Sequence, residues 1–384
     1  MTAWMILLGL RLHACTICLP YPVDSLADHI LSSKALCLAR EDPDRPFILK
    51  PVRHLISDED APEIDLFLDS STRRKLMLAP DKSVLCGLFD STDGPEWRRL
   101  AIHHDEVAPV VKTIINQAEH WRSNPAERSA YFATYLGHDH PTLSDLAHLE
   151  VARAPYTQIR EHAKLLDRDE IVAFLADFRR LEWHPLYILF LAQSDDPRDH
   201  ERIRDSIATS AELHSTLLTA AWATALIEID GPEAIQWLGD QYTSGRSPEE
   251  TRCIFDAMAV QGTSGSPEMR AAIIPVFRSL LVQSPALAPS IAGTLSEWES
   301  DQLVAELKDL LTASPEAFDL TATTAIRSYL RKQTPTTSKS RRPGYLWTGL
   351  MLLAIPLFLA LKRQPKSPQE PSSSRTIARP ASSE

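Results

Sequence analysis

The residues with the clearest chemical potential are two cysteines near the start of the chain, in Cys15-Thr16-Ile17-Cys18. In thiol oxidoreductases this spacing lets a first thiolate, stabilised at a helix N-terminus, form a mixed disulfide that the second thiol resolves. Here the motif precedes a predicted sheet and does not follow a strand of a βαβ unit, so the thioredoxin context is missing. Leu19 follows Cys18 where a c-type haem site requires histidine. Structural disulfides are the favoured interpretation, and redox catalysis, metal ligation or free thiols are the alternatives.

Two further cysteines, Cys37 and Cys86, lie within the first 90 residues. An even number of cysteines in a small domain is typical of a disulfide framework in an oxidising compartment. The candidate disulfide or redox cysteines are therefore Cys15, Cys18, Cys37 and Cys86. Cys253 stands apart, beside apolar residues at helical spacing, and we expect it to fill a core.

Other chemistry is poorly supported by the sequence. The 12 glycines form no GxGxxG, GxxxxGK[ST] or GxSxG motif, and no HExxH motif occurs. Histidines cluster at His103-His104 and at His138 and His140, but an HxH pair ligates zinc only if further ligands converge on it. We expect solvated loop histidines here. We predict no catalytic residue, no cofactor and no metal ligand, so the expected protein is not an enzyme.

Charge is distributed unevenly along the chain. Residues 331–384 carry ten Lys and Arg against two Glu, a net charge of +8, so that residues 1–330 carry −19 of the formal total of −11. An acidic folded part repels phosphate backbones, and no basic cluster precedes residue 331. Nucleic acid is therefore not an expected partner.

Residues 15–104 have the pattern of a small β-rich module. A short helix is predicted near residues 25–31, followed by strands at residues 35–39, 47–56, 64–68, 84–89 and 97–102. Turn residues such as Asp42-Pro43-Asp44 and Asp93-Gly94-Pro95 separate these strands. A leading cysteine before five strands resembles the netrin-like barrels of secreted proteins, although the cysteine spacing differs.

From residue 105 to 330 the hydrophobic period becomes that of helices. Proline followed by Glu marks helix starts at Pro232, Pro248, Pro267 and Pro315, and Pro285 is counted as another. Successive starts from Pro232 to Pro285 lie 16, 19 and 18 residues apart, so alternate starts recur at 35 and 37 residues. That is the length of a helical hairpin, a unit that must stack on its neighbours to bury its apolar faces.

With these proline-marked starts and loops such as Leu136-Gly137-His138-Asp139-His140-Pro141, residues 105–330 resemble HEAT-like helical repeats. Tetratricopeptide arrays are the near alternative, because Trp237-Leu238-Gly239 followed by Tyr242 matches part of their signature. The HEAT-like resemblance implies an α-solenoid that binds protein along a concave face. The whole arrangement is also similar to uncharacterised bacterial envelope proteins with an N-terminal CxxC β module and a C-terminal membrane helix.

The two ends of the chain suggest export and membrane anchoring. Residues 344–361 form an uncharged apolar run whose helix would measure about 27 Å, the lower end for crossing a bilayer core. A buried core helix is the alternative. The run lies between a basic tether (331–343) and a polar tail (362–384), both predicted to be disordered. Residues 1–14 resemble a short signal peptide. The alternatives there are an ordinary buried N-terminal element and acylation of Cys15.

Together these observations predict a mainly α protein: a small β-rich module, a HEAT-like α-solenoid and a single C-terminal transmembrane helix. The expected role is a membrane-anchored, non-enzymatic scaffold of the bacterial envelope that binds an unidentified protein partner. Residues 15–343 would lie in the periplasm or outside the cell, and the tail would lie in the cytoplasm. The alternatives are a membrane-tethered thiol-disulfide oxidoreductase acting through Cys15 and Cys18, and a tail-anchored cytosolic scaffold.

Overall fold

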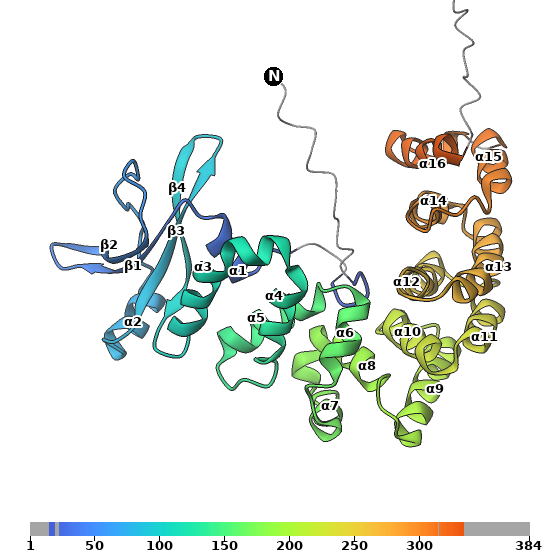
Figure 1. Ribbon diagram of the computed structural model, residues 1–384, viewed down its shortest axis with the longest axis horizontal. Coiled ribbons are helices and arrows are strands. Elements are labelled where there is room, and N and C mark those ends of the chain that lie inside the picture. The colour runs from blue at the N-terminus through green and yellow to red at the C-terminus, as the bar shows by residue number, and fades with distance from the viewer. Residues whose placement is uncertain (1–14, 20–22, 314, 334–384) are drawn as a thin grey trace, which may run out of the picture. The chain divides into compact units, whose positions relative to one another are not determined.

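The structure is a computed structural model that describes residues 15–19, 23–313 and 315–333 (Figure 1). A small sheet near the N-terminus is followed by a long series of helices. The strands are β1 Ala35–Asp42, β2 Arg45–Ile56, β3 Ser83–Ser91 and β4 Gly94–His103. The helices are α1 Leu26–Ser32, α2 Ser70–Leu78, α3 Ala108–Ser123, α4 Pro125–Ala133, α5 Pro141–Ala152, α6 Tyr156–Ala163, α7 Arg168–Phe174, α8 His184–Leu191, α9 Pro197–Glu212, α10 Thr219–Asp230, α11 Pro232–Tyr242, α12 Pro248–Ser264, α13 Pro267–Gln283, α14 Ala288–Glu297, α15 Val304–Ala313 and α16 Leu320–Gln333, with 3-10 turns at Phe178–Trp183, Pro285–Leu287 and Pro315–Ala317.

The predicted fold class is confirmed at the coarse level, because the described chain is mainly helical and its sheet lies near the N-terminus. The sheet is antiparallel with the order β2-β1-β3-β4. Its two central strands, β1 and β3, are buried at most positions. Side chains alternate between the two faces of a strand. Cys37 and Cys86 therefore face one apolar cluster with Ile64 and Leu68, while neighbouring residues of the same strands face another.

The predicted strand at residues 64–68 is wrong. In the described residues this segment makes an isolated bridge between Ile48 and Phe67, and the sheet has four strands instead of five. The chain then enters α2, which the sequence analysis missed. Asp69 caps this helix by accepting a hydrogen bond from the backbone N–H of Thr72 at 2.9 Å. A local cap therefore outweighed a partial strand alternation.

The core of the sheet continues into the first helices past residue 104. Leu36 and Leu85 of the sheet belong to the same buried cluster as Val111 and Ile114 of α3 and Phe132 of α4. The predicted boundary between residues 104 and 105 therefore does not coincide with a break in the hydrophobic core. It coincides with the change from strands to helices.

Partly buried ion pairs fix α1 against α4 and α5. Arg128 of α4 contacts Asp28 of α1 at 2.8 Å and Glu150 of α5 at 2.6 Å. Arg153 pairs with the same two carboxylates, and Ser25, the cap of α1, donates to Glu150. Because each charge faces an opposite one, the network offsets the cost of burying them.

The helix starts follow the predicted proline pattern in three of five cases. Pro232, Pro248 and Pro267 open α11, α12 and α13, and Ser247 and Ser266 cap two of these helices. Pro285 and Pro315 instead open short 3-10 turns, and α14 and α16 begin a few residues later. Ser284 precedes the first of these turns, but its side chain accepts no capping hydrogen bond from the first backbone N–H groups of the turn.

From α8 onward the helices form two layers (Figure 1). The even-numbered helices α8, α10, α12, α14 and α16 pack on one another in succession. The odd-numbered α9, α11 and α13 lie beside them, with α11 packed on α13. Helices α10 to α13 thus each bury one face against a neighbour in the chain and another against a helix of their own layer.

The predicted signal peptide (1–14), transmembrane segment (344–361), tail (362–384) and most of the basic tether (331–343) lie outside the described residues. Within the part of the chain that the structure does describe, no helix is both long and apolar enough to cross a bilayer.

Candidate functional site

The Cys15-Thr16-Ile17-Cys18 motif packs against the helices and not against the sheet. We call residues Cys15–Leu19 the N-terminal strap. Cys15, Ile17 and Cys18 are 2%, 7% and 4% exposed and belong to the large core of the helical region. The backbone N–H of Cys15 donates to the carbonyl of Ala154, just before α6, at 3.3 Å. The predicted grouping of Cys15 and Cys18 with the β-rich module therefore does not match the packing.

The strap is a tight turn that brings its two thiols together. The backbone N–H of Cys18 donates to the carbonyl of Cys15 at 3.1 Å, and the two Sγ atoms lie 3.6 Å apart. A hydrogen bond donated by the Cys18 thiol lowers the pKa of Cys15, against the opposing effect of burial. Burial raises the pKa of Cys18 well above its usual value. Cys15 is thus the thiol that ionises first, as in a reactive pair, but both sulfur atoms are shielded from solvent.

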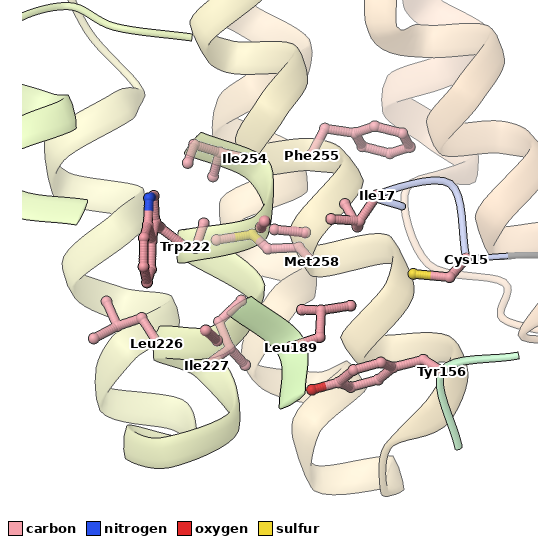
Figure 2. Close-up of a cluster of buried hydrophobic side chains, with 14 of the residues drawn as sticks. Cys15, Ile17, Tyr156, Leu189, Trp222, Leu226, Ile227, Ile254, Phe255 and Met258 are labelled. Atoms are coloured by element: carbon pink, nitrogen blue, oxygen red, sulfur yellow. The ribbon is translucent and has the colours of Figure 1, made fainter. Parts of the chain in front are cut away.

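Figure 2 shows the buried cluster of helical side chains into which the strap packs, and we call the place that the strap occupies in it the groove. Ile17 points toward Phe255 and Met258 of α12, and Cys15 lies beside Tyr156 of α6, all within one buried cluster. Helices α6 and α12 contact one another directly although about 90 residues of sequence separate them. The strap therefore covers a place where distant helices meet.

A polar cluster joins the helices around this groove. The Tyr156 hydroxyl donates to Glu228 of α10 at 2.9 Å, and Arg160 contacts the same carboxylate at 2.6 Å. Gln261 of α12 donates to Glu228 at 2.9 Å and to the carbonyl of Thr224 at 2.9 Å. These polar groups satisfy one another without using the strap.

Cys37 and Cys86 form a second pair, within the sheet. They are direct partners in the register of β1 and β3, and both are fully buried. A hydrogen bond from Cys86 lowers the pKa of Cys37, and the same bond together with burial raises the pKa of Cys86. All five cysteines are free thiols in this structure. The four candidate cysteines thus lie as two pairs in separate cores, and disulfide formation stays a prediction.

The histidine cluster is rearranged relative to the sequence pattern. His140 pairs with His104 instead of acting with His138, and the two Nε2 atoms lie 2.5 Å apart. Burial and the nearby His140 lower the pKa of His104. A neutral pair of this kind shares one hydrogen bond. No group of three or more His, Cys, Asp or Glu among the described residues is arranged to hold a metal ion.

Sequence reasoning missed several polar residues that the fold buries. His148 is 1% exposed, contacts the Tyr187 hydroxyl at 3.1 Å and stacks on Phe174. Glu228 and Gln261 likewise gain partners far away in sequence. In the sequence, each of these residues is marked only as a polar residue among apolar neighbours of a helix. That pattern does not identify the distant residue to which it hydrogen-bonds. Cys253, expected in a core, is partly buried, and burial raises its pKa to about 11.

The geometry defines a mainly helical protein with a small N-terminal antiparallel sheet, two buried thiol pairs and a groove occupied by its own strap. Comparison with known proteins finds no matching family model, no matching curated protein and no matching solved structure.

Proposed function

We propose that this protein is a membrane-anchored, non-enzymatic binding protein of the bacterial envelope, whose helical region is a HEAT-like α-solenoid that binds a partner protein. The observation that carries the proposal is the strap, because the helices already bind a short non-helical segment between distant elements. The two-layer packing of α8 to α16 supports the solenoid, since each pair of helices buries its apolar faces on the next.

A second surface of the helical region also suits binding. A hollow of about 370 Å³ lies between α9, α10 and α11, lined on its apolar side by Ile207, Leu226 and Trp237. Asp205 and Glu233 also line it. Apolar hollows with polar rims are typical of protein and ligand contacts.

The partner can be tested in cells with a photo-crosslinking amino acid. We expect the crosslinker at Trp237 to give one discrete adduct, whereas the same group at Val52 of β2, which is 57% exposed, gives none. Adducts from Val52 alone, or from neither position, would contradict binding through this hollow.

The anchor is tested separately. Deletion of residues 344–361 should release the protein into the soluble fraction, because that run is the apolar segment proposed to cross the membrane. Protease digestion of spheroplasts should cleave residues 15–343 if they lie outside the cytoplasm. Protein that stays in the membrane pellet after a high-salt wash would contradict the proposed anchor.

One observation favours the alternative, a thiol-disulfide oxidoreductase. The 3.6 Å separation of the Cys15 and Cys18 sulfur atoms and the lowered pKa of Cys15 are features of a reactive pair. The burial of both thiols opposes it, because exchange needs access to the attacking sulfur. Disulfide exchange with a model dithiol substrate, lost in Cys15→Ser with unchanged stability, would favour the enzyme over the binding protein.

A further inference from the structure

The strap has the properties of a bound ligand more than those of a structural element. It belongs to no helix or strand, yet three of its five side chains are buried in the helical core. One backbone hydrogen bond joins it to the helical region, from the N–H of Cys15 to the carbonyl of Ala154 at 3.3 Å. Thr16, between two buried residues, faces solvent. The attachment therefore depends mainly on small apolar side chains inserted into the groove.

The groove can keep its form without the strap. Tyr156, Arg160, Glu228 and Gln261 hold α6, α10 and α12 together through hydrogen bonds that involve no strap residue. Helix α12 also packs directly on both α6 and α10. Because a buried polar network of this kind resists rearrangement, removal of the strap leaves a preformed apolar slot beside Phe255 and Met258.

We infer that this groove is a peptide-binding site, that Cys15–Leu19 is its resident occupant, and that a partner protein displaces the strap with a short apolar turn of its own. The inference rests on the proposed binding function and gives the partner its chemistry. The displacing segment would carry a β-branched residue in place of Ile17, flanked by small buried side chains in place of Cys15 and Cys18.

The covalent connection makes the strap a strong competitor. A short tether holds a ligand at an effective concentration in the millimolar range, so a free segment of equal affinity cannot displace it at micromolar concentration. A partner that matches the groove better, or that gains affinity from a second contact, can displace it. The apparent affinity of the partner would then depend both on how well its own segment fits the groove and on how tightly the strap is held there.

The test uses the full-length protein under reducing conditions and a fluorescent synthetic peptide of residues 13–19. Ile17→Asp in the protein places a charge in the apolar slot and should expel the strap, so the peptide should bind this variant at least tenfold more tightly than wild type. Thr16→Asp is the matched control, because Thr16 is exposed, and it should behave as wild type. A peptide carrying Ile17→Asp should not bind.

Absence of peptide binding to an Ile17→Asp protein that melts like wild type would overturn the inference. If that variant is unfolded, thiol alkylation of the wild-type protein decides instead. Opening of the strap alone should expose Cys15 and Cys18 to alkylation at least tenfold faster than Cys37 and Cys86. Equal rates would mean that the strap opens only with global unfolding, which makes it a structural clamp. Neither result depends on the crosslinking test of a partner.

Discussion

The close approach of α12 and α14 at Gly262 gives a sharp test of the helical packing. A Cβ atom at Gly262 would overlap the six-membered ring of Trp298 and lie 3.1 Å from Ile273 Cδ1. The ring cannot move aside easily. Its Nε1 donates to Thr263 at 3.0 Å, and its face stacks on Phe277 with centroids 5.7 Å apart.

The expected cost of Gly262→Ala follows from two opposing effects. Overpacking a core costs about 1–3 kcal/mol. Replacing glycine by alanine inside a helix contributes about 1 kcal/mol of stability. Because the ring is held on two sides, overpacking should dominate, and the variant should lose up to about 2 kcal/mol of unfolding free energy. Gly293→Ala in α14 is the matched control, since nothing lies within 4 Å of its added Cβ. It should gain up to about 1 kcal/mol.

Urea unfolding of the full-length protein, followed by circular dichroism, measures both variants. Gly262→Ala should unfold at a lower urea concentration than wild type, and Gly293→Ala at an equal or higher one. A double-mutant cycle with Trp298→Leu should remove most of the penalty, because the overlapping ring is gone. Equal midpoints for the two alanine variants would refute the close packing of α12 on Trp298.

Three further predictions concern charge, protonation and the domain boundary. Burial raises the pKa of Asp28, but its contact with Arg153 outweighs this effect and holds the pKa well below its usual range. The stabilising contribution of the ionised Asp28 is therefore present above about pH 4 and is lost as the pH falls further. Asp28→Asn should cost about 2 kcal/mol and make the melting temperature less sensitive to acid, as thermal melting would show. Burial lowers the pKa of His148, so the stabilising contribution of the neutral side chain is present above about pH 6.5 and is lost as the pH falls through the lowered pKa. The melting temperature of His148→Gln should therefore decrease less from pH 7 to pH 5 than that of wild type. An equal decrease in both proteins would contradict this role of His148. In a fragment of residues 105–333, α3 and α4 should exchange their amide hydrogens fast while α10 to α14 stay protected, because the fragment lacks the sheet on which α3 packs. Uniform protection of the helices would instead support an independent domain that begins at residue 105.

Features that depend on nearby residues could be predicted from the sequence. The helical period of α3 and α10, the proline starts of α11, α12 and α13, and the hairpin turns at Pro43-Asp44 and Asp93 all follow from local chemistry. The strand at residues 64–68 failed because two local signals competed. A partial alternation favoured a strand, while Asp69 capped a helix that begins at the next residue.

Features that depend on distant residues could not be predicted. Nothing in Cys15-Thr16-Ile17-Cys18 indicates that it packs on residues more than 130 positions later, and its position in the sequence favours a place beside the nearby sheet. The pairing of His104 with His140 is similar, since the fold brings two loops together across α3 and α4. The sequence identified the residue types with chemical potential, and the tertiary contacts decided which of them meet.

The end of α5 connects the strap to the rest of the N-terminal region. The backbone N–H of Cys15 donates a hydrogen bond to Ala154, Asp28 forms an ion pair with Arg153, and Ser25 donates a hydrogen bond to Glu150. The strap and the start of α1 are therefore both attached to one short stretch at the end of α5. The ion pairs hold α1 in position whether or not the groove is occupied, because none of them uses a strap atom. Displacement of the strap therefore removes its apolar contacts without releasing α1 or the sheet. A partner that enters the groove competes with five residues and not with a domain, which makes reversible binding compatible with a stable fold.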